Sequence, residues 1–240
     1  MSGHSKWNNI KHKKEKTDAQ RAKVFTKVGK EIAMAVKAGG ADPNANSKLR
    51  DLISKAKGLN VPNDNIDRII KKAASSDSEN YESIFYEGYG PSGIAVIVEC
   101  ATDNRNRTSA DLRHYFDKFG GNLGTTGCVS YLFSDKGVIL VSASGVEEDA
   151  LMEVALEAGA EDIGLEEDVF EVLTSVSDLY IIREALESAG YTILSTEEEK
   201  IPSATVNLSD EEAVIKMQKL IDALDDNEDV QNYWHNWENE

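Results

Sequence analysis

The sequence predicts an α+β protein, with a three-helix N-terminal domain followed by two ferredoxin-like domains of element order βαββαβ, one inserted into the other. Apolar residues recur at helical spacing between residues 17 and 74. From residue 94 onward, short apolar segments alternate with segments of helical spacing, which is typical of split βαβ units. The segments 152–163 and 182–193 also resemble each other, since each has the pattern helix, glycine, strand.

Three helices are predicted in the N-terminal domain. The first is capped at Thr17 or Asp18 and ends at a pair of glycines, with apolar residues on one side and lysines on the other. The second helix opens at Asp42 and the third at Pro62. Residues 75–80 (SSDSEN) are small, polar and without periodicity, so we expect a linker there.

The next predicted unit is discontinuous. A β-α-β segment at 94–133 lacks its second half, and a second β-α-β segment stands alone at the C terminus. The two segments complete one unit if the chain between them is an insertion, which surface loops tolerate. The strands of this unit are predicted at 94–101, 128–133, 204–208 and 230–237, and its helices at 108–119 and 210–224.

The inserted segment has the βαββαβ pattern by itself. Its strands are predicted at 138–142, 162–165, 169–174 and 191–195, and its helices at 146–158 and 177–189. We therefore expect three domains, at 1–80, at 81–134 together with 204–240, and at 135–203.

The charge distribution is bipolar. The chain has a formal net charge of −17, yet its first 30 residues hold nine basic and two acidic residues. Up to Ala74 the balance is +10, and the remaining residues carry −27. A local charge opposed to the global one indicates a polyanionic partner, most simply nucleic acid. The acidic body should confine that contact to the basic head.

Candidate nucleic-acid-binding residues follow from this charge. Lysines supply phosphate contacts that release counterions, and an exposed indole can stack on a base. For Trp7 an equal alternative is that it pins the tail to the domain together with Ile10. The candidates in the tail and the first helix are Lys6, Trp7, Lys11, His12, Lys13, Lys14, Lys16, Arg21, Lys23, Lys27 and Lys30.

A second candidate contact lies in the motif TDNRNRT at 102–108, between a buried strand and a helix. Helix N-termini favour anions, so Arg105 and Arg107 need a partner at this position. They either contact phosphate or pair with the acidic body, and we favour phosphate. Arg113, two turns into the helix, is placed to join them.

No catalytic, cofactor or metal site is predicted. The chain lacks P-loop, HExxH, GxSxG and CxxC motifs, and its four histidines have no metal-ligand spacing. Cys100 and Cys128 are expected to be buried thiols, so an enzyme that pairs one of them with His114 is a minor alternative. We expect no small-molecule substrate. Without a bilayer-spanning apolar run or a signal peptide, we expect a cytoplasmic location and no membrane partner.

Several motifs resemble those of one family. They are GHSKW at 3–7, PNDNIDRIIKKA at 62–73, YEGYGPSG at 86–93, TDNRNRT at 102–108 and LIDALDDNEDVQ at 220–231. Together they resemble the YebC/PmpR family, which includes the mitochondrial translational activator of cytochrome oxidase subunit I. The resemblance extends nearly end to end and departs at 234–240, where this chain is richer in tryptophan.

The resemblance implies a helical head, two α+β domains and a non-enzymatic role. Bacterial members are described as DNA-binding transcriptional regulators, whereas the mitochondrial relative and some bacterial members act in translation, on the ribosome or on messenger RNA. We therefore predict a DNA-binding transcriptional regulator, with a ribosome- or mRNA-associated factor as the alternative. The ordinary connection between the second and third helices weakens a helix-turn-helix assignment, and Trp7 suits unpaired bases.

Overall fold

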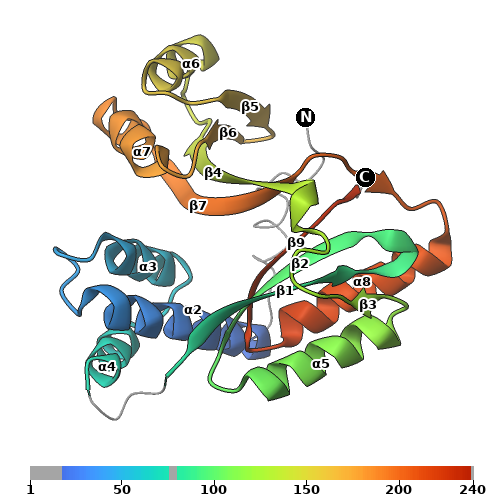
Figure 1. Ribbon diagram of the computed structural model, residues 1–240. Coiled ribbons are helices and arrows are strands. Elements are labelled where there is room, and N and C mark those ends of the chain that lie inside the picture. Colours follow the sequence, from blue (N-terminus) through green and yellow to red (C-terminus); the bar gives the residue numbers. More distant parts are fainter. Residues whose placement is uncertain (1–17, 76–79, 239–240) are drawn as a thin grey trace. The chain divides into compact units, whose positions relative to one another are not determined.

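The computed structural model describes residues 18–75 and 80–238, and of residues 18–21 the backbone only. The contacts divide these residues into two units, which we treat separately (Figure 1). The main unit runs to Val129 and resumes at Leu208–His235, and the inserted unit comprises Ser130–Asn207 and the residues from Asn236. The predicted fold class is confirmed: N-terminal helices are followed by two antiparallel sheets of four strands each in the described residues.

Three helices open the main unit: α2 (Asp18–Gly39), α3 (Ser47–Gly58) and α4 (Asn63–Ala73). The second helix begins later than the predicted start at Asp42, because the buried Asn46 is its cap. The Asn46 side chain accepts a hydrogen bond from the Leu49 N–H at 3.0 Å and donates to the Ala35 carbonyl at 2.9 Å. The core of the bundle includes Val28, Ile32, Leu49, Leu52 and Ile66.

The sheet of the main unit has the strand order β3-β1-β2-β9. Two helices belong to the same unit as this sheet, and they lie beside each other in Figure 1. The strands are β1 (Glu82–Tyr89), β2 (Ala95–Thr102), β3 (Asn122–Leu123) and β9 (Val230–His235), and the helices are α5 (Arg105–Lys118) and α8 (Glu211–Asp226). A 3-10 turn at Pro91–Gly93 joins β1 to β2.

This sheet differs from the prediction in two places. No strand was predicted at Glu82–Tyr89, although all eight residues of β1 pair with β2. The strand predicted at 128–133 is wrong: Ser130–Leu132 is a 3-10 turn, and the segment before it is held as a loop. The buried Glu87 carboxylate accepts hydrogen bonds there from the backbone N–H groups of Gly127 and Val129, at 2.8 and 2.9 Å. In chain order the main unit after its helices therefore reads β1-β2-α5-β3, and α8 and β9 follow after the inserted unit.

The inserted unit has the predicted βαββαβ order and the strand order β5-β6-β4-β7. Its two helices pack on one sheet face, where Leu151 and Ile182 join Ile139 and Val172 in one core. The elements are β4 (Phe133–Ser142), α6 (Glu148–Glu157), β5 (Asp162–Glu166), β6 (Val169–Thr174), α7 (Leu179–Ser188) and β7 (Ile193–Pro202).

A short parallel pair, β8 (Val206–Asn207) with β10 (Trp237–Glu238), completes the inserted unit. The predicted strand at 204–208 is thus reduced to two residues, and the strand predicted at 230–237 is divided at Asn236. The boundaries of the three predicted domains stay a prediction. None of the described helices has both the length and the apolar character needed to cross a membrane.

Candidate nucleic-acid interface

Three of the predicted lysines form a row on α2. Lys23, Lys27 and Lys30 are spaced i, i+4 and i+7, which places them on one side of a helix. The start of α2 lies next to the end of α8 in the main unit (Figure 1). We call this set the lysine row.

The lysine row faces Asp225–Asp229, which comprises the last two residues of α8 and the turn after it and which we call the acidic turn. The Lys23 ammonium group lies 2.8 Å from a carboxylate oxygen of Asp226. The Lys27 ammonium group donates to the carbonyl oxygen of Asp225, also at 2.8 Å. Every lysine of the row therefore contacts the acidic turn, because Lys30 contacts Asp229.

Lys30 is buried, and the prediction that it faces solvent or phosphate is wrong. Its ammonium group lies 2.6 Å from the Asp229 carboxylate, and the two side chains are only 10% and 7% exposed. The remaining donors of Lys30 reach the carbonyl oxygens of Ala101 and Glu228 at 3.3 and 3.0 Å. The ammonium group also lies 5.4 Å from the ring centre of Tyr81, a cation–π distance.

Asp229 is the centre of a polar network. Its carboxylate accepts hydrogen bonds from Arg107 at 2.9 Å and from the Thr108 hydroxyl at 2.8 Å, besides the bond from Lys30. Burial alone raises the pKa of the Asp229 carboxyl, but the hydrogen bonds from Lys30, Arg107 and Thr108 outweigh it and hold the pKa below its ordinary value. The Asp229 carboxyl is therefore ionised at neutral pH.

The motif 102–108 opens α5. The Asn104 side chain caps this helix by accepting a hydrogen bond from the Arg107 N–H at 3.1 Å. Two hydrogen bonds raise the pKa of Arg107, and the bond to Asp229 has a larger effect than the bond to Asp103. Of the two alternatives for Arg107, the structure shows pairing with acidic residues. Arg105 is 67% exposed and 4.0 Å from Glu82, and Arg113 is also exposed.

A cavity of about 560 Å³ opens beside this network within the main unit. Lys30, Arg107 and Asp229 lie on its wall, together with Tyr81 and Tyr115. The wall also includes the acidic residues Asp103, Asp111, Asp226 and Glu228, so it carries more negative than positive charge. Such a wall does not suit phosphate while the acidic turn stays in place.

Seven predicted binding residues lie outside the described residues, and for Arg21 only the backbone, on α2, is described. Their contribution stays a prediction. They are Lys6, Trp7, Lys11, His12, Lys13, Lys14 and Lys16.

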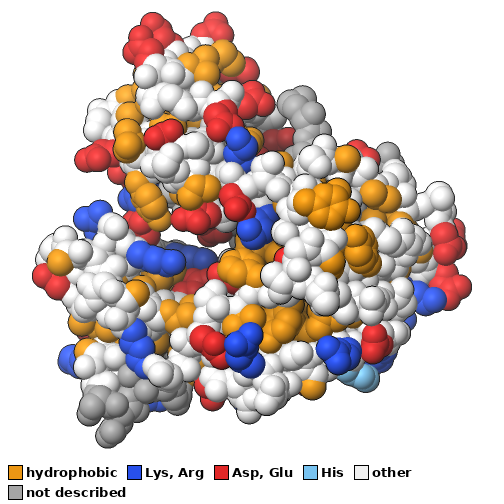
Figure 2. Space-filling view, in the orientation of Figure 1, with side chains coloured by type: hydrophobic (Ala, Val, Ile, Leu, Met, Phe, Trp, Pro, Cys, Tyr) orange, Lys and Arg blue, Asp and Glu red, His pale blue; other side chains and the backbone are white. Residues whose placement is uncertain are grey.

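Sequence reasoning did not single out the cations on α3 and α4. Arg50 and Lys57 are exposed and spaced i, i+7 on α3, and Arg68 and Lys71 are exposed and spaced i, i+3 on α4. The signal was present, because the two α4 residues lie opposite the buried positions of that helix and the two α3 residues flank the buried stripe of theirs. In the part of the chain that the structure describes, none of the four makes an ion pair. Blue side chains are visible around these helices in Figure 2.

The cysteines do not form an activated site. Cys100 is buried, and burial raises the pKa of its thiol to about 12. Cys128 is half-buried in the loop before Ser130, which corrects the expectation of a buried strand thiol, and burial also raises its pKa. A reactive cysteine has a lowered pKa, so neither thiol is suited to nucleophilic catalysis. Among the described residues, no group of three or more His, Cys, Asp or Glu side chains is placed to hold a metal ion.

Two family models match this chain. The TACO1/YebC protein N-terminal domain matches residues 5–76, and the TACO1/YebC second and third domain matches residues 81–237. The chain belongs to the TACO1/YebC family. The helices α2–α4 thus fall within the first model, and both four-stranded sheets fall within the second.

Relatives within the family cover the whole chain. A probable transcriptional regulatory protein of Acetivibrio thermocellus is 59% identical over 99% of both chains. A protein of the same name from Caldicellulosiruptor saccharolyticus is 55% identical over the full length of both. Among solved structures, a conserved hypothetical protein of Aquifex aeolicus matches with a TM-score of 0.86 and 47% identity, over 97% of this chain and 96% of that one.

Proposed function

We propose that this protein is a non-enzymatic, nucleic-acid-binding regulator of gene expression, and specifically a DNA-binding transcriptional regulator. The observation that carries the proposal is the separation of charge between the units. Residues 130–207 hold 18 acidic and three basic residues, a formal charge of −15, so the rest of the chain is nearly neutral at −2. Figure 2 shows acidic side chains gathered over the inserted unit. The names of the relatives support a regulator.

The basic head supplies the contacts in this proposal. Tail lysines and the exposed cations of α3 and α4 bind phosphates, because a flexible ammonium or guanidinium group replaces condensed counterions. Arg105 and Arg113 are exposed and remain candidates on α5, whereas Lys30 and Arg107 are committed to Asp229. The inserted unit repels the polyanion and restricts it to the head.

The test replaces Lys11, Lys13, Lys14 and Lys16 together with Glu and measures filter binding of a DNA duplex over a salt titration. We expect binding to be lost at moderate salt, since four phosphate contacts are removed. Any affinity that remains at low salt should depend less steeply on the salt concentration than that of the wild type. The matched control replaces four lysines outside the basic head with Glu: Lys136 and Lys200 in the inserted unit, and Lys216 and Lys219 on α8. Equal affinity of the test variant and the wild type would falsify the proposal.

A ribosome- or mRNA-associated translation factor is the second candidate, because the resemblance of the motifs extends to a mitochondrial translational activator. Sedimentation of a cell lysate through a sucrose gradient separates the two functions. Co-migration with ribosomal particles that is lost at high salt supports the translation factor. Protein found only at the top of the gradient, with tight binding to one promoter fragment, supports the transcriptional regulator.

A further inference from the structure

We propose that the acidic turn competes with nucleic acid for the lysine row, so that phosphates bind Lys23 only after Asp226 has released it. This inference rests on the proposed function and adds a regulatory contact to it. The acidic turn presents oxygen atoms to all three lysines along about seven residues of α2, which is roughly 10 Å of helix. It thereby occupies the positions that phosphate oxygens would take.

The contact between the lysine row and the acidic turn is strongest at Lys30 and weakest at Lys23. At Lys30 the pair with Asp229 is buried, and the carboxylate has further donors in Arg107 and Thr108. At Lys23 the pair with Asp226 is open to solvent, with the two side chains 34% and 66% exposed. Exposed ion pairs contribute little net free energy, so a polyanion displaces Asp226 far more easily than Asp229.

The backbone of the acidic turn is anchored independently of Lys23. The Asp229 N–H donates to the Asn227 side chain at 2.8 Å, and the Asp229 carbonyl accepts from the Ala101 N–H at 2.8 Å. The Asp225 carboxylate accepts a hydrogen bond from the Tyr233 hydroxyl at 3.2 Å. Release at Asp226 therefore leaves the rest of the turn in place, and the opening is local.

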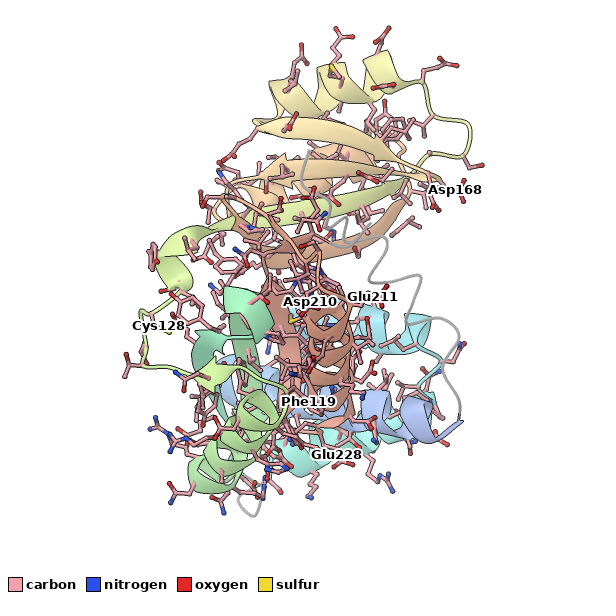
Figure 3. The ribbon with its side chains drawn as sticks, turned by 90° about the vertical axis from the view of Figure 1, so that its right-hand side faces the viewer. Phe119, Cys128, Asp168, Asp210, Glu211 and Glu228 are labelled. Atoms are coloured by element: carbon pink, nitrogen blue, oxygen red, sulfur yellow. The ribbon has the colours of Figure 1, made fainter. Side chains whose placement is uncertain are left out.

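Asp226→Asn tests the competition, with Glu211→Gln as the matched control. Each change removes one exposed carboxylate at one end of α8. Glu211 lies at the start of the helix, and Glu228, in the acidic turn, lies at the other end (Figure 3). Binding of a labelled DNA duplex and of a single-stranded RNA is measured at 0.15 M salt, where the screening length of about 8 Å suppresses the long-range effect of net charge.

We expect Asp226→Asn to bind about two- to fivefold tighter than the wild type, which corresponds to the usual strength of an exposed ion pair, and Glu211→Gln to bind as the wild type does. The salt dependence of the affinity should steepen by about one released counterion, because one more lysine contacts phosphate. If the wild type binds normally and both variants bind with the same affinity as each other, the proposed competition is wrong. The proposed function stands in that case.

Lysine acetylation followed by mass spectrometry gives a second readout, which does not depend on a change in affinity. In the free protein, Lys23 should react faster in Asp226→Asn than in the wild type, and the exposed Lys219 should react equally in both. Added nucleic acid should protect Lys23 in the variant. If no form of the protein binds either probe, the proposed function fails and the competition with it. If the probes bind without protecting Lys23, only the competition fails.

Discussion

Two ion pairs join α2 to the acidic turn, and they differ in burial rather than in chemistry. Lys30–Asp229 and Lys23–Asp226 both join a lysine to an aspartate, at 2.6 and 2.8 Å. The side chains of the first pair are at most 10% exposed, and those of the second at least 34%. Burial removes water that would otherwise solvate a lone charge, so the loss of one partner is costly only in the first pair. Lys30 is therefore a structural lysine, whereas the Lys23 side chain stays accessible to solvent.

The largest effect is expected for Asp229→Asn. The change leaves the Lys30 ammonium group buried without an anion, and breaking a buried pair on one side costs about 3–5 kcal/mol. We expect the free energy of unfolding, measured by urea denaturation with circular dichroism, to fall by that amount. Asp226→Asn removes the same group from the exposed pair and should cost less than about 1 kcal/mol. Similar losses in the two variants contradict the comparison.

Acid pH should weaken the buried pair. The pKa of Asp229 is held below its ordinary value in the folded protein. Such a carboxyl stabilises the fold above its unfolded pKa, near 4, and this contribution is lost as the pH falls through the folded value. Thermal melts at stepwise lower pH should therefore show a loss below about pH 4 that Asp229→Asn lacks. A flat wild-type profile would argue against the assignment.

Arg107→Ala should have an intermediate effect. The Arg107 guanidinium bonds Asp103 and Asp229, but the side chain is half exposed and Asp229 keeps Lys30 and Thr108. We expect a loss of about 1 kcal/mol in the free energy of unfolding, since solvent screens the two pairs. Arg105→Ala is the control, because Arg105 only approaches Glu82 at 4.0 Å. A loss for Arg107→Ala as large as that for Asp229→Asn would show that Arg107 carries the network.

The smallest effect is expected for Lys23→Ala. Its exposed pair with Asp226 should contribute between 0 and about 1 kcal/mol to folding. That difference should shrink further at 0.5 M salt, because dissolved ions screen exposed pairs more than buried ones. Urea denaturation at low and high salt measures both. A loss that persists at high salt would indicate that Lys23 is as structural as Lys30.

The inserted unit could be predicted from the sequence because each of its elements has its own periodicity and stops at a turn residue. Strand β1 could not, since Glu82–Tyr89 mixes polar and apolar residues and runs into the turn-forming Gly90 and Pro91. Pairing with the buried strand β2 determines its conformation. Tertiary contacts of this kind override local propensity in strands more than in helices.

The lysine row could be predicted from helical spacing, but its partner could not. The contacts between α2 and the acidic turn join residues about 200 positions apart in the chain. A solvated turn is the simplest interpretation of Asp225–Asp229 in isolation, because five consecutive polar residues follow a helix. Only the folded chain shows that Asp229 is buried and that Lys30 neutralises it.

The pairing of β4 with β7 brings the two ends of the insertion together. Phe133 is the cross-strand partner of Pro202, and the Ser203 N–H donates to the Leu132 carbonyl at 2.8 Å. The two ends of the insertion therefore leave it within about 5 Å of each other, the usual separation of paired strands. Leu132 and Ser203 therefore flank a segment, residues 133–202, whose removal a two-residue turn would close. Removing it converts a strongly acidic polypeptide into one with a formal charge of −2.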